Sequence, residues 1–217
     1  MTDFEIGRIE PTEHNAKLIQ YMSLVDMQMG GHPDALKEAN PNNADKVKAQ
    51  ADKLDQHPER YAGAFADDEL VGFIKYDDWR VDLDMPFTHG TERIDSLIRR
   101  YVRHDYSVKG NPLGIMGLVS DPRIVDRYPE VAESDIDEML GQLTDQAVDA
   151  AHSGRYPREI RVPHHYNDPA RRATASRRFE TTGQSAVVFG MKQELFSRPA
   201  VATELERFAA AQDEFDS

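Results

Sequence analysis

The chain of 217 residues contains no cysteine. Disulfide bridges, thiolate metal sites and a cysteine nucleophile are therefore excluded. No apolar run approaches the roughly 20 residues that a membrane-spanning helix needs, and residues 1–11 lack the basic-then-apolar order of a signal peptide. Glycine-rich nucleotide loops and G-x-S-x-G nucleophile motifs are also missing. These absences lead us to expect a cytoplasmic protein without a membrane partner.

Positive charge is scarce as well, because 26 Lys and Arg face 39 Asp and Glu for a net charge of −13. Such a surface repels phosphate backbones and anionic lipid, so no nucleic-acid partner is expected. It is compatible with a cationic substrate such as an amine, although strong charge also simply keeps a protein soluble. The length and the 39% hydrophobic content fit one domain with a sizeable core.

Periodicity divides the N-terminal half into a strand, two helices and a hairpin. Residues 4–9 alternate between apolar and polar and predict a half-buried strand. A helix is expected from Thr12 to the glycine pair that begins at Gly30, and a more polar helix over residues 42–56, with a loop between them. Two further strands, residues 61–66 and 70–76, flank the acidic turn Asp67-Asp68-Glu69 and predict a β-hairpin.

The C-terminal half alternates strands and helices. The apolar, glycine-containing run 113–119 predicts a central strand that a ligand approaches closely. Residues 134–153 carry one apolar stripe and predict an amphipathic helix. Residues 159–163 and 186–191 are the remaining strand candidates, with an Ala/Arg-rich helix between them. An antiparallel hairpin followed by strand–helix–strand units indicates a mixed α/β fold with right-handed crossovers.

This order of elements resembles the GCN5-related N-acetyltransferase (GNAT) family. The resemblance implies an acyl-CoA N-acyltransferase-like fold over residues 1–199, in which helices flank a mixed central sheet. An insert of about residues 80–112 would lie between the third and fourth strands. Residues 200–217 would form a C-terminal helix and tail, a candidate homodimer contact. The family's activity implies acetyl-CoA as co-substrate and a small-molecule amine as acceptor.

The resemblance also implies where the cofactor binds. The fourth strand would hold the pantetheine arm through its backbone near Gly117, Leu118 and Val119. The following loop, residues 120–133, would hold the pyrophosphate at the N-terminus of the next helix, where free N–H groups attract anions. Arg123 and Arg127 are the cationic candidates there.

This loop nevertheless departs from the family pattern. It contains no glycine, and two prolines remove backbone donors from it. The helix that follows starts with acidic residues, and Ser134 with Asp137 favours a variant capping box instead of an anion site. The loop therefore leaves open whether the cofactor is bound at all.

The exit of the fifth strand matches the family better. Asn167 opens an Asn-x-x-Ala segment, which in the family begins a helix that carries a tyrosine, the general acid for the departing thiolate. Here either Thr174 or Phe179 stands at that tyrosine's position, depending on the alignment, and Asn167 is the candidate cofactor contact. The usual acid is therefore absent.

His165 and Tyr166 are the candidate catalytic replacements. A histidine that titrates near neutrality can deprotonate an ammonium, and a tyrosine can protonate a thiolate. The alternative is that histidines at a strand exit are structural. The other histidines are dispersed without metal-ligand spacing, so no metal site is expected.

Two functions follow from these observations. The first is N-acetylation of a small amine by its direct attack on the acyl-CoA thioester. The second is a non-catalytic GNAT-fold module for ligand sensing or protein interaction that has lost acetyl-CoA binding.

Overall fold

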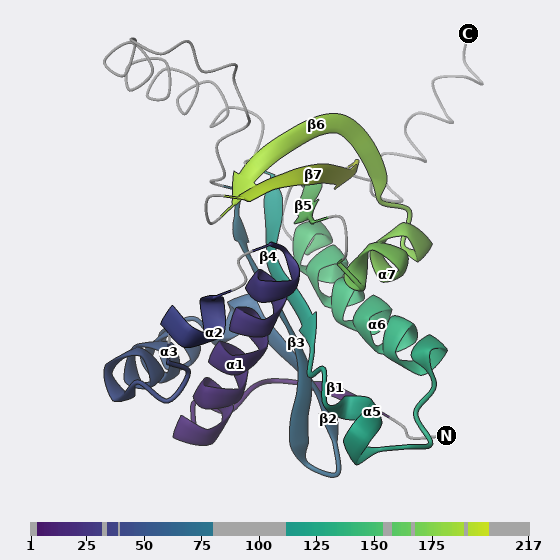
Figure 1. Ribbon diagram of the computed structural model, residues 1–217. Helices are drawn as coiled ribbons and strands as arrows, with labels where there is room; N and C mark the ends of the chain where they lie inside the picture. Colours follow the sequence, from purple (N-terminus) through teal and green to yellow (C-terminus); the bar gives the residue numbers. More distant parts are fainter. Residues whose placement is uncertain are drawn as a thin grey trace, which may run out of the picture.

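The computed structural model of the chain describes residues 4–31, 34–38, 40–79, 112–153, 158–165, 168–188 and 191–199. Within these ranges, seven strands form one sheet in the order β1-β2-β3-β4-β5-β7-β6. Helices cover both faces of this sheet (Figure 1). None of the described helices is long and apolar enough to cross a bilayer.

The N-terminal half follows the predicted order, with short additions. Its elements are β1 (Glu5–Gly7), α1 (Glu13–Met29), α2 (Ala35–Glu38), α3 (Ala44–Gln56), the 3-10 turn η1 (Pro58–Arg60), β2 (Tyr61–Ala66) and β3 (Glu69–Asp78). Thr12 caps α1, because its hydroxyl accepts from the Asn15 N–H at 3.1 Å. Asp67 and Asp68 have φ of 48° and 65°, which suits the tight turn of a β-hairpin. The short helix α2 lies in the expected loop.

The C-terminal half contains β4 (Leu113–Ser120), α5 (Ile124–Arg127), α6 (Glu133–His152), β5 (Ile160–His164), α7 (Ala170–Ser176), β6 (Glu180–Val188) and β7 (Met191–Arg198). The expectation of a single last strand over residues 186–191 is wrong, because β6 and β7 form an antiparallel pair. Gly183 lies inside β6 with φ of 71°, where the register shifts between Thr181 and Ser185. This bulge and the polar residues around it hide the strand's alternation.

The start of α6 also differs from the prediction. The capping residue is Ala132, and its N–H donates to the Asp135 carboxylate at 3.0 Å. Ser134 therefore lies inside the first turn and is not the cap. Asp135, at the third helical position, accepts the hydrogen bond from the backbone N–H of Ala132. A helix that began at Ser134 would not include this bond.

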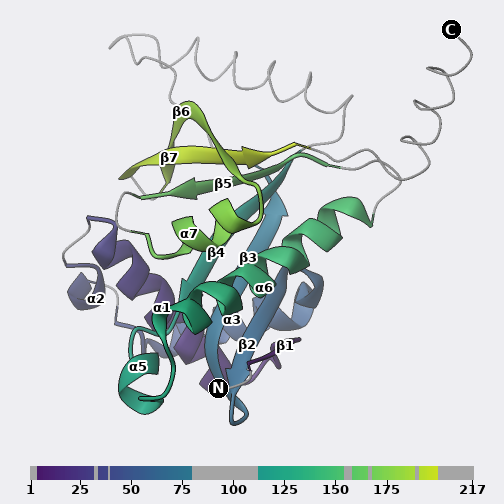
Figure 2. The ribbon, with the colours of Figure 1, turned by 90° about the vertical axis from the view of Figure 1, so that its right-hand side faces the viewer.

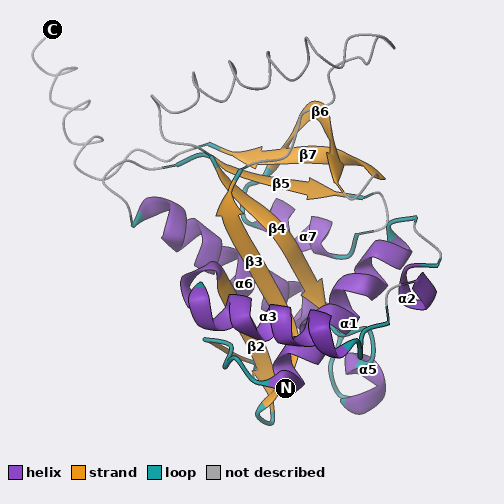
Figure 3. Cartoon of the chain, turned by 90° about the vertical axis from the view of Figure 1, so that its left-hand side faces the viewer, coloured by secondary structure: helices purple, strands orange, loops and turns teal. Residues whose placement is uncertain are grey.

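Two apolar clusters lie on opposite faces of the sheet. The larger packs α6 and α7 against β2 to β5, with Met139, Leu140 and Leu143 fully buried. The smaller packs α1 and α3 against β2 and β3, with Met22 and Leu54 at its centre. Figure 2 shows the α6 side and Figure 3 the α1 side. Burial of the apolar stripes of these helices is the main stabilising contribution.

The sheet opens between β4 and β5, its fourth and fifth strands in spatial order. β4 and β5 are parallel and pair only at Leu113 with Ile160 and at Gly114 with Arg161. β4 stays paired along its length with β3, and β5 with β7, so the sheet divides into two halves that run at a steep angle (Figure 3). A register shift in the β3–β4 pairing places Met116 as an extra residue of β4, which bends the strand at this opening.

Two expected segments lie outside the described residues. These are the insert, apart from Pro112, and the C-terminal helix after residue 199. The proposed domain boundaries therefore remain predictions.

Candidate functional site

A pocket occupies the opening between β4 and β5. Its lining residues come from β4, from β5 and its exit, from the end of α1 and from β7. They are Asp26, Met27, Ile115, Met116, Gly117, Leu118, Val162, Pro163, His164, His165, Asp168 and Gln193. The structure therefore brings three predicted site residues, Gly117, Leu118 and His165, to one place. Val119 packs with the α1 cluster and is not among the lining residues.

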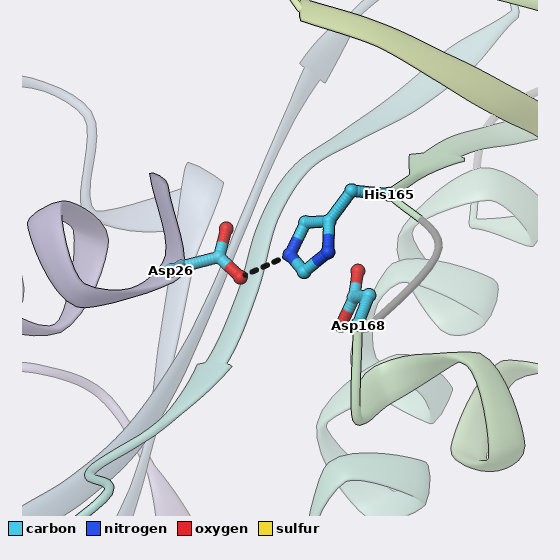
Figure 4. A group of neighbouring side chains, drawn as sticks. All are labelled: Asp26, His165 and Asp168. Carbon is cyan, nitrogen blue, oxygen red and sulfur yellow. Dashed lines mark hydrogen bonds and ion pairs between the residues drawn. The ribbon is translucent and has the colours of Figure 1, made fainter. Parts of the chain in front are cut away.

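His165 pairs with a carboxylate that sequence reasoning missed. Its imidazole Nε2 lies 3.1 Å from Oδ1 of Asp26, a residue of α1 that precedes it by 139 positions. His165 is only 5% exposed, and its Nδ1 is buried without a hydrogen-bond partner within the described residues. Figure 4 shows the imidazole between the carboxylates of Asp26 and Asp168.

The two carboxylates control the charge of His165. Burial by itself would lower the pKa of His165, but the hydrogen bond to Asp26 and the charges of Asp26 and Asp168 outweigh burial and raise it. Burial raises the pKa of Asp26, and the neighbouring Asp168 charge acts in the same direction. The pair therefore holds a proton at a higher pH than a free imidazole does, which suits a group that accepts a proton during a reaction.

His164 has a structural role. It is 1% exposed, with Nδ1 2.5 Å from Asp168 Oδ2 and Nε2 2.9 Å from Thr174 Oγ1. Its ring also packs edge-on against Phe196. Since both ring nitrogens are engaged, His164 connects the end of β5 to Thr174 of α7 and positions Asp168.

The two positions that align with the family's tyrosine both lie in the fold's interior. Thr174 is fully buried, and its hydroxyl contacts the carbonyls of Ala170 and Arg171. Phe179 belongs to the larger apolar cluster. Neither is among the residues that line the pocket, which agrees with the absence of the usual acid.

The two candidate phosphate-binding arginines both have acidic partners. Arg123 makes two side-chain bonds to Asp121, at 2.9 and 2.7 Å, and its guanidinium lies over the Tyr21 ring. Burial opposes ionisation of Asp121, but the bonds and charge of Arg123 outweigh it and lower the pKa of this carboxyl. Arg127 pairs with Glu69. The Arg123 side chain remains 38% exposed and so can still reach an anion.

The acidic start of α6 is partly compensated from another helix. Arg172 of α7 bonds to Asp137 at 2.8 Å and to Glu133 at 2.5 Å. The repulsion that these carboxylates would exert on a phosphate is therefore weaker than the sequence suggests. Tyr166 and Asn167 lie outside the described residues, so their roles remain predictions.

One sequence signal pointed to Asp26. It lies four residues after Met22 and eight after Leu18, on the helical stripe that α1 buries. The Asp26 side chain is 29% exposed, and a carboxylate that is largely buried requires a partner. The partner itself is beyond the reach of spacing arguments, because only the fold brings β5 to the end of α1.

No protein-family model matches the chain, and no curated protein matches its sequence. Solved structures do match. An N-acetyltransferase from Staphylococcus aureus Mu50 has a TM-score of 0.51 at 10% identity, covering 91% of this chain and 99% of that one. The C-terminal condensation domain of Ebony, in complex with beta-alanyl-dopamine, has a TM-score of 0.52 at 9% identity, with 91% and 99% covered. A GNAT-family acetyltransferase from Streptococcus agalactiae 2603 has a TM-score of 0.50 at 7% identity, with 92% and 96% covered.

These likenesses define the class of architecture. The chain has the GNAT fold, a mixed seven-stranded sheet flanked by helices, and the fold predicted from the sequence is confirmed.

Proposed function

We propose that this protein is an acyl-CoA-dependent N-acetyltransferase that acetylates a small amine, with acetyl-CoA as co-substrate. One observation carries the proposal: the sheet opens between β4 and β5 into a pocket whose lining includes the His165–Asp26 pair. A slot between two strands that is lined by a proton-accepting pair suits transfer of a short acyl group. The Ebony domain adds support for an amine acceptor, because beta-alanyl-dopamine is itself an amide of an amine.

In this proposal the pantetheine arm lies along β4. Beyond Gly114, β4 has no β5 partner within the described residues, so its backbone groups on that side are available to hydrogen-bond a ligand. The predicted contacts are those near Gly117, Leu118 and Val119. The bend at Met116 places free backbone beside the pocket, where it can polarise the thioester carbonyl.

The pyrophosphate is assigned to the loop between β4 and α6. Arg123 and Arg127 supply its positive charge, with Arg123 the more accessible of the two. Arg172 partly compensates the acidic start of α6 by pairing with Glu133 and Asp137. Asn167, at the exit of β5, is the remaining proposed contact to the cofactor.

The chemistry is direct transfer. The amine reaches the pocket as an ammonium, drawn by the carboxylates of Asp26 and Asp168, and gives one proton to His165. Its nitrogen then attacks the thioester carbonyl carbon, so that a C–N bond forms and the C–S bond breaks. A second N–H proton passes to the departing thiolate, with Tyr166 as the proposed carrier. The products are the N-acetyl amide, CoA and one proton.

The test is release of free CoA thiol from acetyl-CoA in the presence of a panel of small primary amines. We expect amine-dependent release by the wild-type chain. In the H165Q variant it should fall by about 10²–10⁴-fold, the usual contribution of a general base. The control variant is H57Q, since His57 is exposed and lies outside the pocket. Release that H165Q leaves unchanged would contradict the base assignment, and the absence of release with every amine would contradict the proposed activity.

We also propose a cytoplasmic location, which the absence of cysteine supports. Homodimerisation through residues 200–217 is a further proposal. Light scattering of the full chain and of a chain ending at residue 199 tests it. A dimer that persists after this truncation would contradict the proposed contact.

A further inference from the structure

Two carboxylates converge on one imidazole in the lining of the pocket. One nitrogen of His165 and one oxygen from each of Asp26 and Asp168 lie within 4.8 Å of one another. Nδ1 of His165 is buried and has no hydrogen-bond partner within the described residues, and its ring lies between the two carboxylates (Figure 4). A buried polar atom without a partner requires an explanation, and an ion bound at this position is one.

We propose that Asp26, His165 and Asp168 bind a divalent transition-metal ion of the Zn²⁺ type. Imidazole nitrogen and carboxylate oxygen are ligands that Zn²⁺ accepts, and three protein ligands with one open position are typical of accessible zinc sites. Mg²⁺ and Ca²⁺ prefer oxygen alone. A doubly charged ion also neutralises two carboxylates that otherwise repel each other in a partly desolvated pocket.

Binding of this ion requires a contraction of the site. Tetrahedral ligation with bonds of about 2.0–2.1 Å places the ligand atoms about 3.3 Å apart. The three candidate ligand atoms already lie within 4.8 Å of one another, so a bound ion would draw them together by up to about 1.5 Å. The side chain of Asp26 is 29% exposed and lies near the end of α1, so it has room to adjust.

Asp168 is held by a second layer of contacts. Its Oδ2 lies 2.5 Å from Nδ1 of His164, and its Oδ1 accepts the N–H of Ala170 at 2.8 Å. Each carboxylate oxygen keeps a further lone pair for an ion. His164 is in turn fixed by Thr174. Ligating carboxylates that are oriented by such hydrogen bonds are the usual arrangement in metal sites.

The sequence analysis expected no metal site, because the three proposed ligands do not share a metal-ligand spacing in the chain. Only Asp168 is near His165 in sequence, and Asp26 comes from α1. Metal binding does not depend on acetyl transfer. One consequence, however, rests on the proposed function: an ion that occupies the His165 lone pair removes the proposed base, so Zn²⁺ should inhibit the transferase.

The experiment is calorimetric titration of Zn²⁺ into the full chain after chelator treatment. We expect one site in the wild-type protein, at least about tenfold weaker binding in D26N and in H165Q, and no change in H57Q. Titration with Mg²⁺ should give no binding. Thermal melts of each variant check that it is folded, and Asp168 is left unchanged because it also supports α7. Co²⁺ supplies a second readout, since a tetrahedral site gives it visible absorption bands that D26N should lose.

Two results would overturn the site. One is no binding at millimolar Zn²⁺, and the other is equal affinity in the wild type, D26N and H165Q. The thiol-release assay separates the two proposals. Zn²⁺ binding without any acetyl transfer would refute the proposed function alone, whereas acetyl transfer without Zn²⁺ binding would refute the metal site alone.

Discussion

The Asp26→Asn variant tests the proposed base most sharply through its pH dependence. Wild-type His165 must be neutral to accept a proton, so kcat/KM should rise with pH through its raised pKa. The groups that face this imidazole are Asp26 on α1, Asp168 before α7 and Arg171 within α7. In D26N, burial and the Arg171 charge still lower the pKa of His165, and of these groups only the Asp168 charge raises it. The pKa of His165 should therefore fall, and the acidic limb of the profile should move to lower pH.

The size of the shift follows from the geometry. At the observed 3.1 Å between Nε2 and Oδ1, unit charges attract by about 5 kcal/mol at an effective dielectric constant of about 20. Desolvation of both groups and the partial exposure of Asp26 cancel much of this. Opposite charges this close usually shift a pKa by about 1–3 units. We therefore expect the pKa of His165 in D26N to fall clearly below its wild-type position.

The assay is kcat/KM against pH, in chelator so that no metal occupies the pocket. The acceptor should be one whose own pKa lies below the pH range measured, so that its titration does not mask the enzyme's. D34N is the matched control, because the carboxylate of Asp34 is exposed and pairs with Lys37 outside the pocket. NMR titration of the His165 ring gives the same pKa directly. An acidic limb at the same pH in D26N and in the wild type would refute the reasoning.

Three further predictions concern stability and positioning. D121N should destabilise the fold by about 1–3 kcal/mol in urea unfolding at neutral pH, because Asp121 is buried and bonds Arg123. Since the pKa of Asp121 is lowered, this difference in stability should be present above about pH 4 and shrink as pH falls below it. A difference that grows in acid would contradict the assignment. H164F should lower the free energy of unfolding by about 2–3 kcal/mol in the same measurement, because Asp168 and Thr174 each lose a buried hydrogen-bond partner. A change within about 0.5 kcal/mol, the range for surface substitutions, would contradict this prediction. G141A should fail to give the stabilisation of up to about 1 kcal/mol that Ala gives over Gly in a helix. Its Cβ would meet the Arg177 guanidinium at 2.5 Å, and moving that group would weaken its ion pairs with Glu138 and Asp145. The same change made in an R177A background should stabilise, and equal effects in both backgrounds would refute the clash.

Most helices and strands could be predicted because the residues that specify each of them lie within its own segment of the chain. The β2–β3 hairpin is specified by two apolar strands around Asp67 and Asp68, and α6 by one apolar stripe. The β6–β7 hairpin was missed because β6 is polar and contains the Gly183 bulge, so that its alternation does not stand out. The short helices α2 and α5 have four residues each, which is too few for a period to be visible.

The site was predicted in part. His165 could be proposed from its place after β5. The helical stripe of α1 marks Asp26, but neither its pairing with His165 nor the place of Gln193 in the pocket could be proposed, since long-range packing brings α1 and β7 there. The pairing of Arg123 with Asp121 involves residues two apart, yet sequence alone does not show that the aspartate is buried. The contact of Arg172 with the start of α6 likewise depends on how α7 docks.

The central claim is that acetyl-CoA binds in the opening between β4 and β5. Hydrogen–deuterium exchange of the full chain with and without acetyl-CoA tests it most directly, because the backbone of β4 on the β5 side should exchange unless a ligand bonds to it. We predict that acetyl-CoA protects the amides of residues 115–118 and of the loop 120–133. Unchanged exchange in both segments at millimolar acetyl-CoA would contradict the account.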